Sequence, residues 1–103
     1  MEKLNFKADL DYSKDAIISK MIIKKEAGNV TLFSFDKGQS LSEHTAPFDA
    51  LVQVMEGKAE IRIDGVPHEM SEGESIVMPG GVPHAVAAPE KFKMLLTMIK
   101  SKQ

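Results

Sequence analysis

Turn-forming residues interrupt this chain at short and regular intervals, and this feature constrains its fold most. Glycine or proline recurs roughly every 8 to 12 residues, and the apolar runs between them lack helical spacing. Asp64-Gly65 is the strongest signal, because this dipeptide favours the two-residue turn of a β-hairpin. Before it, residues 58–64 alternate between apolar and charged side chains, so that Ala59, Ile61 and Ile63 share one face. The sequence therefore predicts an all-β protein.

We expect about nine strands of roughly 4 to 9 residues, arranged as an antiparallel sandwich or barrel. Residues 1–15 mix charges with isolated apolar side chains and are predicted to be a lead-in that lies across the barrel. Residues 16–25 are rich in β-branched side chains on both faces, which is typical of a strand buried on two sides or paired with another subunit. Turns are expected at Gly28-Asn29 and at Glu56-Gly57, and the polar residues 39–43 are expected to lead into His44.

Length and composition exclude several classes of function. A chain of 103 residues has room for one domain and none for an added helix-turn-helix. The net charge is −2 with both signs scattered, so the basic stripe of a nucleic-acid-binding protein is missing. There is no cysteine, and no apolar run approaches the roughly 20 residues of a membrane span. We therefore expect a cytoplasmic protein that binds neither nucleic acid nor membrane.

Two stretches of the chain each place a histidine beside turn residues. In the first, Gly38 is followed six positions later by His44, and Pro47 then precedes a predicted strand. In the second, Pro79 ends a short apolar run, because proline cannot donate to a sheet ladder. Gly80-Gly81 is predicted to supply the positive backbone angles of a tight reversal before His84. Each histidine is thus expected at the beginning of, or just before, a strand.

These stretches resemble the paired signatures of the cupin superfamily, over roughly residues 30–100. The pattern Gly-x5-Pro-x-Gly-x2-His-x3-Asn is matched at Gly73, Pro79, Gly81 and His84, with Ala88 in place of the Asn. The pattern Gly-x5-His-x-His-x3-Glu-x6-Gly is matched at Gly38, His44 and Gly57, with Ala46 and Ala50 in place of the second His and the Glu. The resemblance implies an antiparallel jelly-roll barrel, or double-stranded β-helix, and one cupin domain over residues 1–103.

The resemblance also implies that His44 and His84 point into one cavity and act as metal ligands. Neutral imidazole coordinates divalent transition metals such as Zn, Ni, Fe, Mn or Cu. Most protein metal sites have three or four protein ligands, and Ala46 and Ala50 cannot contribute any. The expected cofactor is therefore one divalent ion that is either weakly held or absent.

Few other side chains are candidates for the site. Asp49 has the wrong parity to point inward beside Ala50, unless a bulge after Pro47 moves it and turns Gln53 inward as well. Glu43 is predicted to be solvated. His68 is predicted to lie at the surface, and Met78 and Met94 either line the cavity or fill the core.

Three functions fit these residues. The first is a binding module whose apolar pocket holds a small organic ligand at two imidazoles, with or without a weakly bound metal. The second is a metal-dependent isomerase, lyase or dioxygenase, as found among similar cupins. The third is a metal-free structural or partner-binding barrel. The loss of the carboxylate favours the first, because a general base and a ligand disappear together. A homodimer is expected to cover residues 16–25.

Overall fold

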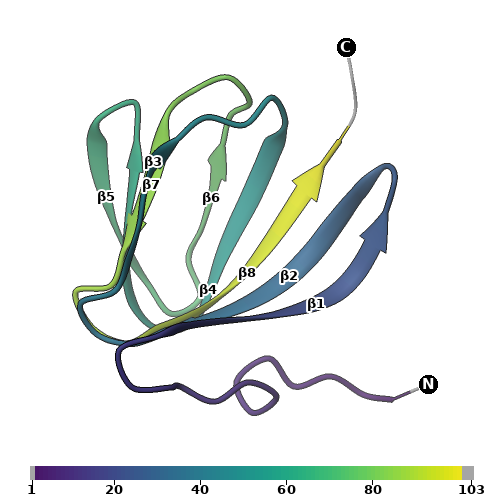
Figure 1. Cartoon of the computed structure of the whole chain (residues 1–103), viewed down its shortest axis with the longest axis vertical. Helices are drawn as coiled ribbons and strands as arrows, with labels where there is room; N and C mark the ends of the chain where they lie inside the picture. Colours follow the sequence, from purple (N-terminus) through teal and green to yellow (C-terminus); the bar gives the residue numbers. More distant parts are fainter. Residues whose placement is uncertain (1, 101–103) are drawn as a thin grey trace.

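The computed structural model describes residues 2–100, and every regular element in that range is a β-strand (Figure 1). All strand pairs are antiparallel, as predicted. No segment of residues 2–100 forms a helix of the length and apolarity that a bilayer span requires. The strands are β1 (Ile17–Lys25), β2 (Gly28–Phe35), β3 (Ser40–His44), β4 (Asp49–Ile63), β5 (Val66–Ser71), β6 (Ser75–Met78), β7 (His84–Ala87) and β8 (Phe92–Ile99).

The strands form two sheets that share β4 and curl towards each other (Figure 1). The larger sheet has the order β1-β2-β8-β4-β6, and the smaller has the order β5-β4-β7-β3. β4 passes from one to the other at a bulge beside Gly57, whose φ of 81° is left-handed. A Cβ at this position would lie 2.1 Å from the carbonyl oxygen of Lys91, so only glycine fits.

Three details of the predicted strands are wrong. Glu56-Gly57 bends a continuous strand of 15 residues and does not turn the chain. The polar stretch before His44 is itself a strand, β3. The first hairpin turns at Glu26-Ala27, because Lys25 already pairs with Gly28. The described residues therefore contain eight strands rather than about nine.

The core lies between the two sheets and contains the side chains that alternation assigned to it. Ala59 and Ile61 are buried as predicted, while Ile63 is only half-buried at the end of β4. Phe35 and Phe92 stack with ring centroids 4.6 Å apart. Phe92 is the cross-strand partner of Gly57, so the stacked rings lie beside the bend of β4, and their burial stabilises the fold.

β1 is an edge strand, not a strand buried on two sides. Among the strands of residues 2–100 it pairs only with β2, and Met21 and Ile23 are each 51% exposed. An unpaired edge of nine residues with exposed apolar side chains leaves backbone donors and acceptors open to another chain.

The N-terminal lead-in lies across the outside of the larger sheet, below β1 in Figure 1. Lys7 and Tyr12 of the lead-in both contact Lys93 of β8. The ammonium group donates to the carbonyl oxygen of Lys7, lies 3.7 Å from a carboxylate oxygen of Glu56 and sits 4.9 Å from the Tyr12 ring centroid. Tyr12 in turn donates to Glu56 at 2.6 Å. We call Tyr12, Glu56 and Lys93 the strap cluster.

Candidate functional site

Two loops meet at the rim of the barrel and fix each other. One, residues 45–48, follows β3, and the other, residues 79–83, precedes β7. The Gly81 N–H donates to the carbonyl of Ala46 at 2.8 Å, and the Gly80 N–H donates to Asp49 Oδ1 at 2.8 Å. Gly81 has the predicted positive φ of 78°, but Gly80 does not. Gly80 is needed for close approach instead, because a Cβ there would lie 2.8 Å from the carbonyl oxygen of Pro47.

The structure brings His44 and His84 together. They are direct cross-strand partners on β3 and β7, and their ring centroids lie 4.3 Å apart at 70°. The two Nε2 atoms are 3.1 Å apart. His84 is 7% exposed, whereas His44 lies at the rim and is exposed. One imidazole is thus held inside the barrel and the other at its entrance.

Backbone carbonyls determine the proton positions on both rings. His44 Nδ1 lies 2.9 Å from the Ser42 carbonyl, and His84 Nδ1 lies 3.2 Å from the Val82 carbonyl. A carbonyl only accepts, so each Nδ1 must carry the hydrogen. A neutral imidazole has one N–H, which leaves a lone pair on each Nε2. With these tautomers two lone pairs face each other, and a proton, a metal ion or a ligand donor placed between them would satisfy both.

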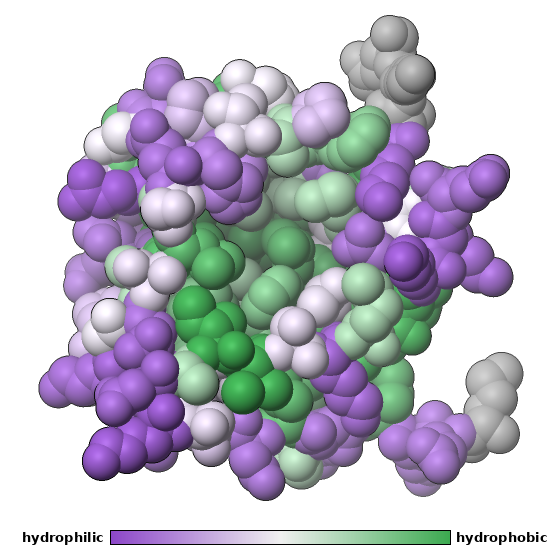
Figure 2. Space-filling model, in the orientation of Figure 1, coloured by the Kyte–Doolittle hydropathy of each residue, from purple (hydrophilic) through white to green (hydrophobic). Residues whose placement is uncertain are grey.

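An apolar cavity of about 60 Å³ surrounds this pair. Figure 2 shows apolar side chains lining a hollow in the middle of the molecule, with polar side chains around it. Among the described residues no acidic or basic side chain other than the two histidines lines the cavity. Its lining consists of Phe33, Leu41, His44, Ala46, Phe48, Ala50, Met78, His84, Val86, Met94, Leu96 and Met98.

Ala46 and Ala50 line the cavity, as the family spacing implied, but the proposed substitutes do not. Asp49 is exposed and holds Gly80, and Gln53 lines a separate groove beside Glu72 and Ser75. The reason is that the β4 bulge lies between Val54 and Glu56, not after Pro47, so the parity of residues 49–53 is undisturbed.

The remaining candidates divide between the cavity and the surface. Met78 and Met94 line the cavity, and Glu43 is exposed as predicted. His68 lies on β5 opposite Ile61 and is half-buried, outside the cavity. Within residues 2–100, no group of three or more His, Cys, Asp and Glu side chains converges in a way that suits a metal ion. Met98 was not predicted to line the cavity, although it follows Met94 by four positions and therefore lies on the same face of β8.

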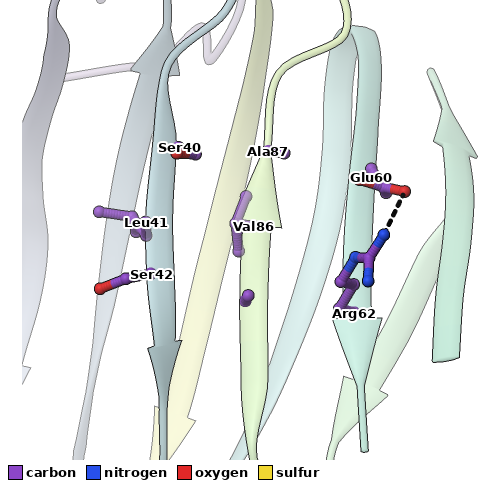
Figure 3. A pocket seen from close by; sticks show the side chains of 8 residues that line it. Ser40, Leu41, Ser42, Glu60, Arg62, Val86 and Ala87 are labelled. Atoms are coloured by element: carbon purple, nitrogen blue, oxygen red, sulfur yellow. Dashed lines mark ion pairs between the residues drawn. The ribbon is translucent and has the colours of Figure 1, made fainter. Parts of the chain in front are cut away.

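A second groove, on the outer face of the smaller sheet, is unrelated to the histidines. It has a volume of about 200 Å³ and runs over β7 between β3 and β4. Figure 3 shows Glu60 and Arg62 beside each other on β4, with Ser40 and Ser42 across on β3. The Arg62 guanidinium lies 3.7 Å from the Glu60 carboxylate. This ion pair is exposed, and neutralisation by Glu60 makes Arg62 a weak anchor for an anion.

The barrel, the strand β4 that its two sheets share and the paired histidines define a class of protein, which comparison with known families identifies. The family model described as Cupin domain matches residues 31–100, and the chain belongs to the cupin superfamily. The predicted family and fold are thereby confirmed. Among curated proteins, none matches the chain.

Solved structures are similar over nearly the whole chain. A conserved protein of unknown function from Streptococcus pyogenes is 37% identical, with a TM-score of 0.93 over 99% of this chain and 90% of its own. A cupin 2 conserved barrel domain protein from Leptotrichia buccalis is 43% identical, with a TM-score of 0.91 over 94% of this chain. This chain spans 47% of the length of that protein. A cupin superfamily protein from Desulfitobacterium hafniense is 25% identical, with a TM-score of 0.86 over 89% of this chain and 84% of its own.

Proposed function

We propose that this protein is a small-molecule-binding barrel whose pocket holds one weakly bound transition-metal ion on His44 and His84. The observation that carries the proposal is the pair of Nε2 lone pairs, 3.1 Å apart, with both Nδ1 atoms turned to backbone carbonyls. Ligating histidines commonly donate the other ring N–H to such an acceptor, which fixes the tautomer and the ring orientation. The pair is therefore prepared to accept a cation.

The separation of the two nitrogens suits a single ion. Nitrogen ligands bind Zn²⁺ at about 2.0–2.1 Å, and two such bonds span the 3.1 Å between the Nε2 atoms. Two protein ligands leave the rest of the coordination shell to water or to oxygen atoms of a bound molecule. We therefore expect a weak divalent site that a chelating organic ligand strengthens.

The cavity limits what that organic ligand is. A volume of about 60 Å³ accommodates roughly four to six water-sized groups. The walls are apolar apart from the imidazoles, so the ligand has a small apolar body and one polar end, such as a carboxylate or a hydroxyl group. A sugar phosphate, by contrast, would bury several hydroxyl groups against apolar walls that offer them no hydrogen bonds.

Binding is favoured over catalysis because the described pocket contains no carboxylate. The isomerase, lyase and dioxygenase alternatives each require a residue that moves a proton or holds the ion firmly. In the described pocket only the two imidazoles could transfer a proton or hold the ion. An imidazole that binds metal through Nε2 has no lone pair left to act as a base.

Metal binding with and without His84 tests the proposal. The protein is stripped with EDTA, dialysed against Zn²⁺ and analysed for metal by mass spectrometry. We expect one ion per chain, loss of binding in His84→Ala and no change in His68→Ala, which removes a half-buried histidine outside the pocket. Nitrogen NMR of the imidazoles gives a second readout, since both Nε2 signals should move on binding. No metal at any loading, or equal binding in both variants, contradicts the proposal.

We also propose that the protein is a homodimer through β1. The exposed Met21 and Ile23 on an edge strand support this, because a second copy of the strand would pair the open backbone groups and cover both side chains. Sedimentation analysis should give a dimer for the wild type and a monomer for Ile23→Lys. A wild-type monomer at all concentrations contradicts this proposal and leaves the pocket proposal unaffected.

A further inference from the structure

We propose that the pocket selects monovalent copper over divalent metals, with the thioethers of Met78 and Met98 completing the two-histidine site. This inference rests on the proposed function, in which the pocket takes a metal ion. It concerns which ion the pocket prefers and which side chains decide the preference.

The first argument is the position of the two methionines. Ala50 is the cross-strand partner of Met78 on β6 and also of Met98 on β8. Directly opposed side chains in antiparallel strands point to the same face, with Cβ atoms about 4.5–5.5 Å apart. A methionine therefore stands on each side of the alanine that occupies the family's carboxylate position. Both line the same cavity as His44 and His84.

The second argument is the chemical character of these donors. Thioether sulfur is a soft ligand and selects Cu(I), whereas carboxylate and carbonyl oxygens suit Mg, Ca and Mn. The chain has seven methionines and no cysteine, so thioethers are its only soft sulfur ligands. Imidazole binds Cu as well as Zn. The pocket thus offers two imidazoles and three thioethers, of which those of Met78 and Met98 flank Ala50, and no hard anionic ligand.

The third argument is charge. All these donor groups are neutral, and the described cavity contains no acidic side chain to balance a cation. The cost of moving an ion from water into an apolar site rises with the square of its charge. A divalent ion in this pocket keeps two uncompensated charges, and a monovalent ion keeps one. Neutral soft donors in an apolar cavity therefore favour Cu(I).

Metal competition tests the selectivity. Cu(I), kept reduced under anaerobic conditions, is titrated against the chromogenic chelator bicinchoninate, and Zn²⁺ and Mn²⁺ affinities are measured on the same protein. We expect Cu(I) to bind most tightly. Met78→Leu and Met98→Leu should each weaken Cu(I) by at least the roughly 10-fold that loss of an outer-shell partner costs a metal site. Zn²⁺ binding should stay unchanged in both variants. Met70→Leu, a buried methionine outside the cavity lining, is the matched control.

Methionine methyl NMR gives a readout that does not depend on affinity. With ¹³C-methyl methionine and Ag(I) as a redox-inert probe, the Met78 and Met98 signals should shift and the Met70 signal should not. Zn²⁺ binding as tight as Cu(I), with both Met→Leu variants unchanged, overturns this inference and leaves the proposed function standing. Failure of every metal to bind overturns both.

Discussion

The strap cluster and the histidine pair are two groups of polar side chains in an otherwise apolar barrel. They differ in whether other residues of the chain supply their hydrogen-bond partners. In the strap cluster, the Lys93 ammonium has a carbonyl, a carboxylate and an aromatic face around it, and the Tyr12 hydroxyl has the same carboxylate. In the cavity, the two Nε2 atoms contact each other and meet no donor from residues 2–100, because neither carries a hydrogen when both rings are neutral and each Nδ1 donates to its carbonyl. The first group is complete, and the second requires a cation or a ligand donor.

We therefore expect the strap cluster to stabilise the fold and the two histidines to bind a ligand or ion. A satisfied polar network rigidifies the structure, and removing one member leaves the others buried without partners. An incomplete pair costs free energy until something binds, so its removal should do little harm to the fold. Stability measurements and binding measurements should therefore respond to opposite regions of the molecule.

The largest expected effect comes from completing the cavity pair with the missing family ligands. The double variant Ala46→His with Ala50→Glu adds two donors at positions that line the cavity. We expect Zn²⁺ affinity to rise by several orders of magnitude, because a four-ligand site replaces a two-ligand site. Chelator competition measures the change.

The matched control places the same side chains on the outside of the barrel. Ala85→His with Ala87→Glu lies on the outer face of β7, in the groove of Figure 3, and should leave affinity unchanged. Unchanged affinity in the cavity variant would mean that Ala46 and Ala50 do not occupy ligand positions. The metal-free cavity variant should be less stable by several kcal/mol, because it buries an unpaired Glu.

The next largest effect comes from breaking the strap cluster. Glu56→Ala removes the acceptor that Tyr12 and Lys93 share, and Lys93 has only 6% of its side chain exposed. We expect the free energy of unfolding to fall by about 1–3 kcal/mol. His84→Leu should stay within about 1 kcal/mol of wild type, since the lost hydrogen bond to Val82 is offset by apolar burial. Urea unfolding measures both, and equal destabilisation by the two changes would refute the comparison.

Acid should weaken the strap cluster by a smaller amount. The hydrogen bond from Tyr12, together with nearby Lys93, holds the pKa of Glu56 below its ordinary value of 4.5. The ionised carboxylate therefore stabilises the folded state fully above the unfolded pKa, and this contribution is lost as the pH falls through the folded pKa. Asp36 has a pKa lowered by the Asp15 N–H and acts in the same direction, so wild type alone does not isolate Glu56.

Comparing wild type with a Glu56 variant removes the contribution of Asp36, because Asp36 is present in both proteins. The gap in unfolding free energy between wild type and Glu56→Gln should be constant between pH 7 and about 5, and shrink below 4.5. Because Glu56 is about one-third exposed, solvent screening keeps the gap small. A gap that persists unchanged to pH 3 would show that the carboxylate's charge contributes nothing.

Prediction from sequence was correct where one local signal determines the backbone, and it failed where the same signal fits two structures or where a strand has little apolar pattern. Asp64-Gly65 turns as expected because both residues have positive φ, at 51° and 78°. Gly57 also has positive φ, yet the strand continues through it, since a left-handed glycine suits a bend as well as a turn. β3 was missed because only Leu41 is even half-buried among its polar neighbours. Edge strands of this kind leave little apolar pattern to detect.

The site shows a similar division. The spacing around His44 and His84, together with the family resemblance, predicted which two side chains meet. Their tautomers depend on the carbonyls of Ser42 and Val82, and every residue has such a carbonyl, so no sequence pattern identifies them. The pairing of Ala50 with two methionines depends on the register of three strands, which alternation within one strand cannot supply.

The smallest expected effect tests whether the strap cluster is a network or only one ion pair. Burial and the contact with Glu56 raise the pKa of Tyr12 well above its usual range, so its hydroxyl remains a donor from acid to neutral pH. Tyr12→Phe keeps the ring beside Lys93 and removes only the 2.6 Å hydrogen bond to Glu56. We expect a loss of about 1 kcal/mol, or roughly 4–8 °C in Tm, with metal affinity unchanged. Since Glu56 would also lose its main source of pKa depression, the acid sensitivity of Tyr12→Phe should approach that of Glu56→Gln. If Tyr12→Phe keeps the wild-type pH profile, Lys93 alone accounts for the ionised carboxylate and the cluster is a simple ion pair.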